Sequence, residues 1–85
     1  MPIVKLFANL RKITGLKEVV VSGRNAGEIL SELVKVKPEL GNYLFENEQI
    51  RPFVIITLNG QHLSDMQTVV MEHDQIAIFP PITGG

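Results

Sequence analysis

Only one stretch of this chain shows the apolar period of an α-helix, and this restricts the possible folds more than any other feature of the sequence. The helical stripe consists of Ala26, Ile29, Leu30, Leu33 and Val34. Positions i, i+3, i+4, i+7 and i+8 lie on one side of a helix. Asn25 and Glu28 have the spacing of a capping box, and Pro38 disfavours helical geometry just before it. We therefore predict one main helix between Asn25 and Pro38, with a further short turn at 38–40.

Runs of β-branched and aromatic residues with the length of strands lie on both sides of this helix. Residues 3–8 and 17–22 are two such runs, and the short polar segment between them, which contains Gly15, predicts a hairpin. Residues 53–58 are apolar in both sets of alternating positions, which is typical of an interior strand with cover on each face. The segment 41–52 gives no clear pattern.

The remaining strands are marked by their turns. Asn59 and Gly60 both accept positive φ, as a type I′ turn requires, and predict a hairpin to a short edge strand at 61–63. Residues 75–79 form a final strand that Pro80 ends. The predicted order is β-β-α-β-β-β, an α+β domain in which one helix covers one face of a mixed sheet.

A single helix leaves the other face of this sheet open, so large apolar residues on that face are candidate contact residues. Phe7 and Phe79 fit best, because they are large and lie on the first and last predicted strands. The pattern alone equally allows both to be ordinary core residues.

Composition removes several classes of function. The 85 residues, 45% of them apolar, suffice for one small globular domain. Eight basic and nine acidic residues give a net charge of -1, so we expect no nucleic-acid ligand. With no membrane span and no secretory signal in the sequence, we expect a soluble cytoplasmic protein. The absence of cysteine excludes a disulfide framework, a thiol nucleophile and cysteine-ligated metal.

The side chains that could carry catalysis or hold a metal form no known motif. The two histidines, His62 and His73, have Asp65, Glu72 and Asp74 nearby in the sequence, but they lie around predicted turns and lack ligand spacing. We therefore expect no metal and no bound cofactor. In the first loop, Arg11 and Lys12 could hold a phosphate or a partner carboxylate.

The segment Pro80-Pro81-Ile82-Thr83-Gly84-Gly85 differs in kind from the rest. Its two prolines disfavour helix and sheet, so we predict a globular domain over 1–79 and an extended tail over 80–85. Six extended residues reach about 20 Å, enough to enter the cleft of another protein. The glycines carry no Cβ, so a narrow tunnel could close around bare backbone. The tail is therefore suited to presenting the carboxylate of Gly85.

A free carboxylate must be activated before a nucleophile can attack it. It is ionised at neutral pH, and its oxygen leaves poorly. Because this chain has no ATP-binding motif, a partner would have to use ATP to form an acyl-adenylate on Gly85.

The ending Phe79-Pro80-Pro81-Ile82-Thr83-Gly84-Gly85, with the strand order above, resembles the small, sulfur-carrying subunits of molybdopterin synthase, which are ubiquitin-like β-grasp proteins. The resemblance implies that an E1-like adenylyltransferase adenylates Gly85 and that sulfur then replaces an oxygen to give a thiocarboxylate. The tail would insert into the large synthase subunit and donate its sulfur to cyclic pyranopterin monophosphate.

The same resemblance implies roles for individual residues. Phe7, Phe79 and Leu63 would form an apolar docking patch with Arg11 near its edge. The reacting end would be Gly84-Gly85, and the tail residues that contact the partner would be Pro80, Pro81, Ile82 and Thr83. The chain departs from the family pattern at His73-Asp74, where relatives often have a Gly-Asp turn, and this leaves the tail chemistry untouched.

Three other functions remain open at this point. The same activated end could be captured by a lysine amine, which would make the chain a ubiquitin-like protein modifier. It could donate sulfur to thiamin thiazole or another thio-cofactor, although Pro80-Pro81 argues against the thiazole. A ubiquitin-like interaction module would keep its function without Gly84 and Gly85.

Overall fold

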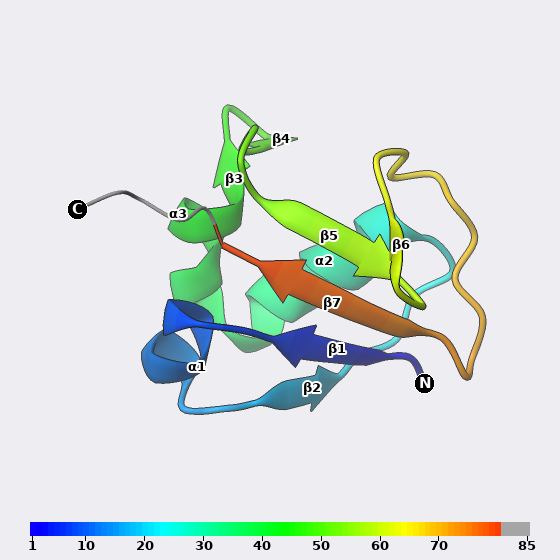
Figure 1. Ribbon diagram of the computed structural model, residues 1–85, viewed down its shortest axis with the longest axis horizontal. Helices are drawn as coiled ribbons and strands as arrows, with labels where there is room; N and C mark the ends of the chain where they lie inside the picture. The colour runs from blue at the N-terminus through cyan, green and yellow to red at the C-terminus, as the bar shows by residue number, and fades with distance from the viewer. Residues whose placement is uncertain (81–85) are drawn as a thin grey trace.

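The computed structural model describes residues 1–80, which form a five-stranded mixed sheet with the main helix across one face (Figure 1). The elements are β1 (Ile3–Leu6), α1 (Asn9–Thr14), β2 (Glu18–Val20), α2 (Ala26–Val36), a 3-10 turn η1 (Pro38–Leu40), α3 (Gly41–Leu44), β3 (Phe45–Glu46), β4 (Gln49–Ile50), β5 (Ile55–Leu58), β6 (Gln61–His62) and β7 (Gln75–Phe79). The expected α+β class with a mixed sheet is confirmed. Residues 81–85 lie outside the described part, so the predicted boundary of the tail stays a prediction.

The last strand occupies the middle of the sheet. The strand order is β2-β1-β7-β5-β6, and β7 runs parallel to β1 and antiparallel to β5. The predicted hairpin of β1 and β2 is present, with Val4 opposite Val19. A separate two-stranded sheet, β3–β4, lies beside the start of β5 (Figure 1). The last strand, β7, is therefore paired with a neighbouring strand along each of its edges.

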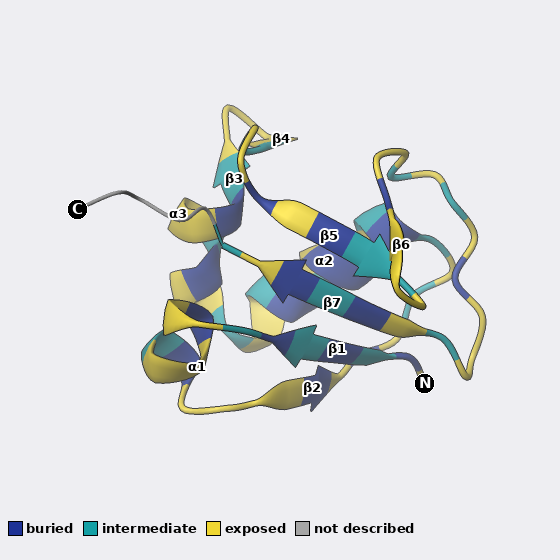
Figure 2. Cartoon of the chain, in the orientation of Figure 1, coloured by how far each residue is buried: buried dark blue, intermediate teal, exposed yellow. Residues whose placement is uncertain are grey.

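The core lies between α2 and the inner face of the sheet. On the helix, four residues of the predicted stripe are fully buried, Ala26, Ile29, Leu30 and Leu33, whereas Val34 is only partly buried. The buried residues that face them from the sheet include Val4, Leu6, Ile56, Ile76 and Ile78. Figure 2 shows the alternation of buried and less buried positions along β1 and β7. Apolar burial of this kind is the main stabilising term of the fold.

The start of α2 departs slightly from the predicted capping box. The side chain of Asn25 accepts a hydrogen bond from the Glu28 N–H at 2.9 Å, as expected of an N-cap. The Glu28 carboxylate, however, accepts from the N–H of Arg24 at 3.3 Å and not from that of Asn25. The predicted short turn after Pro38 is present as η1.

Two segments contain structure that the sequence pattern did not predict. The loop between β1 and β2 contains the helix α1, which is too short to show an apolar stripe. The segment 41–52 contains α3 and the β3–β4 hairpin, whose turn places Asn47 and Glu48 at φ 52° and 65°. Glutamate rarely adopts positive φ, and strands of two residues cannot display alternation.

The expectation of cover on both faces of β5 is wrong. Val54 and Ile56 are buried on the inner face, but Ile55 is 49% exposed on the outer one. β5 is an interior strand only in the sense that it lies between two other strands, β7 and β6. Its outer face is open because the main helix packs on the opposite side (Figure 1). The Asn59–Gly60 turn is confirmed, with φ 51° and 86°.

Candidate functional site

The open face of the sheet carries an aromatic pair at the end of β7. Phe7 directly follows β1, Phe79 ends β7, and the parallel register brings the two side by side. Their rings are stacked, with centroids 4.5 Å apart and planes inclined by 11°. Phe79 keeps 36% of its surface exposed. The structure thus brings the two predicted aromatic contact residues together beside Pro80, where the described chain ends.

Arg11 completes this group from α1. Its Nε donates a hydrogen bond to the Leu6 carbonyl at 2.7 Å, and its guanidinium carbon lies 5.0 Å from the centroid of the Phe7 ring. This is the geometry of a cation–π contact. Its terminal amino groups donate to no acceptor within residues 1–80. Arg11 therefore offers oriented donors at the edge of the aromatic pair, a geometry suited to a carboxylate.

A strained residue sets this arrangement. Ala8 has φ 54° and ψ -133°, close to the first central position of a type II′ turn, where glycine is usual. The Leu10 N–H closes the turn onto the Phe7 carbonyl at 3.2 Å. The turn reverses the chain into α1, which returns Arg11 over Phe7. Strain of this kind persists where the surrounding packing enforces it.

The predicted exposure of Leu63 is wrong. Leu63 is 7% exposed, belongs to the core, and donates its N–H to the Ile56 carbonyl at 2.8 Å. The outward position belongs to His62, which lies opposite Thr57 in the β5–β6 register. A shift of one residue along a strand moves a side chain to the other face, and the sequence pattern does not determine which residues of β6 pair with those of β5.

The structure adds two apolar residues that sequence reasoning did not place in the docking patch. Ile55 pairs with Phe79, so its exposed side chain extends the aromatic pair toward β5. Phe53 lies two residues before Ile55 and is 76% exposed. The apolar pattern of 53–58 predicts cover on both faces, so the sequence gives no sign that these side chains are exposed. We call Phe7, Phe79, Ile55, Phe53 and Arg11 the docking surface.

Most of the predicted tail lies outside the described residues. Of the predicted tail contacts, only Pro80 lies within the described residues, where it is partly buried. The others, and the reacting end, lie outside them: Pro81, Ile82, Thr83, Gly84 and Gly85. Their predicted roles stay predictions.

Asp74, one of the acidic residues near the two histidines, makes structural contacts in the loops. The pKa of Asp74 is held below its ordinary value, first by the side-chain amide of Asn59 at 2.9 Å and then by the backbone N–H of Met71 at 2.7 Å. These bonds tie the β5–β6 turn to the turn before β7. Within residues 1–80, no group of three His, Asp or Glu side chains is placed to hold a metal ion.

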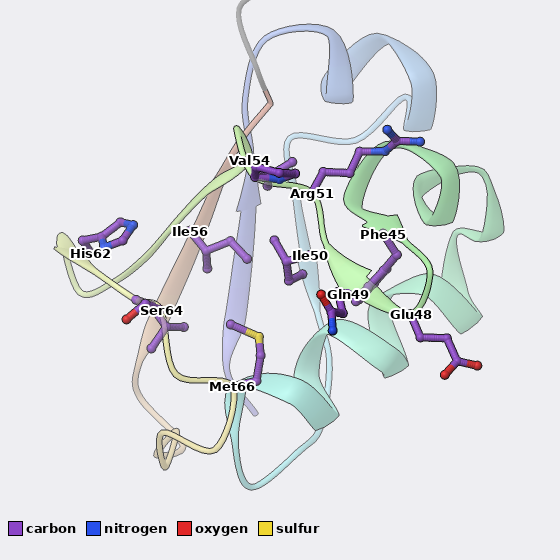
Figure 3. Close-up of a pocket in the computed structure, with 12 residues that line it drawn as sticks. Phe45, Glu48, Gln49, Ile50, Arg51, Val54, Ile56, His62, Ser64 and Met66 are labelled. Atoms are coloured by element: carbon purple, nitrogen blue, oxygen red, sulfur yellow. The ribbon is translucent and has the colours of Figure 1, made fainter.

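A groove of about 430 Å³ lies on another side of the molecule, between the β3–β4 hairpin and the β5–β6 region. Apolar side chains including Phe45, Ile50 and Met66 line it (Figure 3). His62 also lines this groove, from the β5–β6 side. Of the predicted contact residues, only Leu63 lines this groove within the described chain. No helix among residues 1–80 has the length and apolar character needed to cross a membrane.

Comparisons with known proteins agree with this architecture. The chain is 35% identical over 85 residues to the molybdopterin synthase sulfur carrier subunit of Arabidopsis thaliana, covering 96% of this chain and 80% of that protein. It is 30% identical over 88 residues to small archaeal modifier protein 3 of Haloferax volcanii, covering 96% of each. The solution structure of small archaeal modifier protein 1 from Methanosarcina acetivorans matches with a TM-score of 0.90 and 32% identity, covering 99% of this chain and 95% of that one.

These relatives and neighbours share one fold, the ubiquitin-like β-grasp, and the fold expected from the sequence is confirmed. The model of the ThiS family matches residues 4–85, which includes both glycines at positions 84 and 85. This chain therefore belongs to the ThiS family of ubiquitin-like proteins.

Proposed function

We propose that this protein is the sulfur carrier subunit of a molybdopterin synthase, with the carboxyl group of Gly85 as the site that is loaded. The observation that carries the proposal is the docking surface, because it places stacked, partly exposed aromatic rings and an oriented arginine beside Pro80. The family match through Gly85 and the 35% identical sulfur carrier subunit support it.

The chemistry would proceed in two steps on the Gly85 carboxylate. A carboxylate oxygen attacks the α-phosphate of ATP in an E1-like adenylyltransferase, which releases pyrophosphate and leaves an acyl-adenylate. Hydrosulfide then attacks the acyl carbon and displaces AMP, and the product is a thiocarboxylate. The chain itself would contribute the acyl group and the docking surface, while its partners supply the catalytic groups.

In the final step the loaded tail would enter the large synthase subunit, where the sulfur is transferred to cyclic pyranopterin monophosphate. Thiocarboxylate sulfur is softer and more nucleophilic than carboxylate oxygen. A chain without cysteine has no internal thiol that could attack its own activated carboxyl group. We expect this cycle in the cytoplasm, where ATP is available.

The docking surface would bring each partner onto the root of the tail. Aromatic residues and arginine are enriched where protein interfaces bind most tightly. The Phe7–Phe79 stack needs no rearrangement before contact, and the Arg11 guanidinium is already oriented by the Leu6 carbonyl. Preorganisation of this kind lowers the entropic cost of association.

A second candidate function is that of a protein modifier, in which a lysine amine captures the activated Gly85. The identity with small archaeal modifier protein 3 and the structural match to small archaeal modifier protein 1 favour it. Blotting of cell extracts separates the two functions. Laddered conjugates that disappear when Gly85 is deleted support the modifier, whereas a single free band supports the carrier alone.

Intact-mass measurement tests the carrier function directly. The full chain is incubated with the E1-like enzyme encoded in the same genome, ATP and a sulfur donor. We expect a mass increase of about 16 Da, the difference between sulfur and oxygen, and its loss on adding the large subunit and cyclic pyranopterin monophosphate. A variant with one alanine appended after Gly85 is the control and should remain unloaded. A wild-type chain that keeps its plain acid under these conditions rules out the carrier.

A further inference from the structure

The β5–β6 turn places an asparagine directly before a glycine, and this pair of residues can react with itself. Asparagine is chemically labile. Asn59 and Gly60 are both exposed, and a Cβ added at Gly60 would meet no atom within 4 Å. Because Gly60 has no side chain and its surroundings are open, little shields its backbone nitrogen. That nitrogen is the nucleophile nearest in the chain to the side-chain carbonyl carbon of Asn59.

Deamidation of this pair takes two steps, with water as the only other reactant. The Gly60 nitrogen attacks Cγ of Asn59, the Cγ–Nδ2 bond breaks, and ammonia leaves with the proton of the former Gly60 N–H. Water then opens the resulting succinimide ring at one of its two carbonyl carbons. The product at this position is an aspartate or an isoaspartate, whose main chain contains an extra methylene group.

Hydrogen bonds hold Asn59 against the start of β7 and oppose this reaction. Figure 1 shows the turn between β5 and β6 next to that end of β7. The Asn59 Nδ2 donates to Asp74 Oδ1 at 2.9 Å, and its Oδ1 accepts from the Gln75 N–H at 2.9 Å. The Asn59 N–H donates to the Gln75 carbonyl at 2.8 Å. The side-chain amide is thus bonded at both its nitrogen and its oxygen.

The backbone of the turn opposes the reaction as well. Asn59 and Gly60 have φ 51° and 86°, as a type I′ turn requires. Ring closure needs the peptide group between them in the orientation of a type II′ turn, because there its nitrogen eclipses Cβ of Asn59. The peptide must therefore flip, and the side chain must leave Asp74 and Gln75, before the ring can close. Local opening of the turn thus limits the rate in the folded protein.

We propose that Asn59 is a site of spontaneous deamidation, which the folded protein suppresses through Asp74 and Gln75. The product cannot restore the bonds that were broken. An aspartate places a carboxylate oxygen where Nδ2 now donates to Asp74, so two like charges face each other. An isoaspartate lengthens the backbone of a two-residue turn. A chain that has reacted therefore loses the contact between this turn and β7 permanently.

The test is the rate at which asparagines of the full-length chain become deamidated, followed by peptide mapping and mass spectrometry at mildly alkaline pH. Asn47 is the internal control. It occupies the same position of the β3–β4 turn, with φ 52°, but Glu48 follows it, and a side chain there shields the nitrogen. In urea, where the chain is unfolded, Asn59 should react about tenfold faster than Asn47. Folding should slow the reaction at Asn59 about tenfold or more.

Variants separate local opening of the turn from global unfolding. Asp74→Ala should raise the rate at Asn59 in the folded protein about fivefold, because it removes one of the bonds to the amide. Asp65→Ala is the matched control, since exposed Asp65 accepts a hydrogen bond from the Gln67 N–H elsewhere in the β6–β7 connection. Ile29→Val, a change in the core on α2, destabilises the whole domain. Both controls should stay within about twofold of wild type.

Each part of the proposal can be refuted. If Asn59 reacts no faster than Asn47 in urea, it is not a deamidation site. Equal rates at Asn59 in the folded and unfolded chain would exclude suppression by the fold. The role of Asp74 fails if Asp74→Ala leaves the rate unchanged, lowers it as loss of a catalytic base would, or raises it no more than Ile29→Val does. No partner enzyme takes part, so each outcome leaves the proposed function as it stands.

Discussion

Substituting Ala8 by glycine should stabilise this protein, although the same change normally destabilises a folded domain. Ala8 has φ 54° and ψ -133°, a region that glycine enters freely and alanine does not. A residue held in such a sparsely populated region costs about 1–3 kcal/mol. Glycine adds about 0.4–1 kcal/mol of conformational entropy to the unfolded chain, which opposes the gain. The net expectation is a stabilisation of about 0.5–2 kcal/mol.

For a domain of this size, 1 kcal/mol moves the thermal midpoint by about 4–8 °C. Far-UV circular dichroism during thermal unfolding, together with a urea titration, measures the change. Ala77→Gly in β7 is the matched control, because strand geometry suits alanine there and glycine should cost about 0.5–1 kcal/mol. An Ala8→Gly variant that loses as much stability as Ala77→Gly would refute the assignment of strain to the turn between β1 and α1.

Two further predictions concern the core and the turn before β7. Leu63→Ala should lower the free energy of unfolding by about 2–5 kcal/mol without weakening docking, because Leu63 is buried. Phe79→Ala should weaken docking and cause a smaller loss of stability. Urea unfolding and partner titration on both variants check this contrast. Because the pKa of Asp74 is lowered in the folded state, its contribution to stability is present above the unfolded pKa of about 3.9 and is lost as pH falls through the lower folded value. Asp74→Asn should therefore reduce the pH dependence of the urea midpoint in that acidic range, and an unchanged dependence would contradict the assignment.

Local patterns were enough to predict the elements that carry strong signals. The stripe of α2 spans three turns, and the Asn59–Gly60 pair encodes its own turn, so neither depends on distant contacts. Short elements lack such signals. The short helices α1 and α3 are stabilised by packing against the core, where Leu10 and Leu44 are buried. The β3–β4 hairpin packs against the same core through partly buried Phe45 and Ile50.

The candidate site was predictable in part for the same reason. Phe7 and Phe79 could be proposed as contact residues because they are large and lie on the first and last strands, although the pattern alone equally allowed both to be core residues. The one-residue register of β6 depends on its pairing with β5, so Leu63 was placed on the wrong face and His62 was overlooked. Phe53 was missed because an apolar run gives no sign of which face lacks cover. The central position of β7 could not be predicted either, because it depends on pairing between segments far apart in the sequence.

That central place has a mechanical consequence. A partner that binds the tail and then withdraws would pull along β7, which pairs with β1 at four positions and with β5 at four more. A force in this direction would have to break the hydrogen bonds of both strand pairs together, and not one after another. The domain should therefore survive repeated extraction from a tight-fitting tunnel, and a cycle of handover between enzymes would leave it folded and reusable.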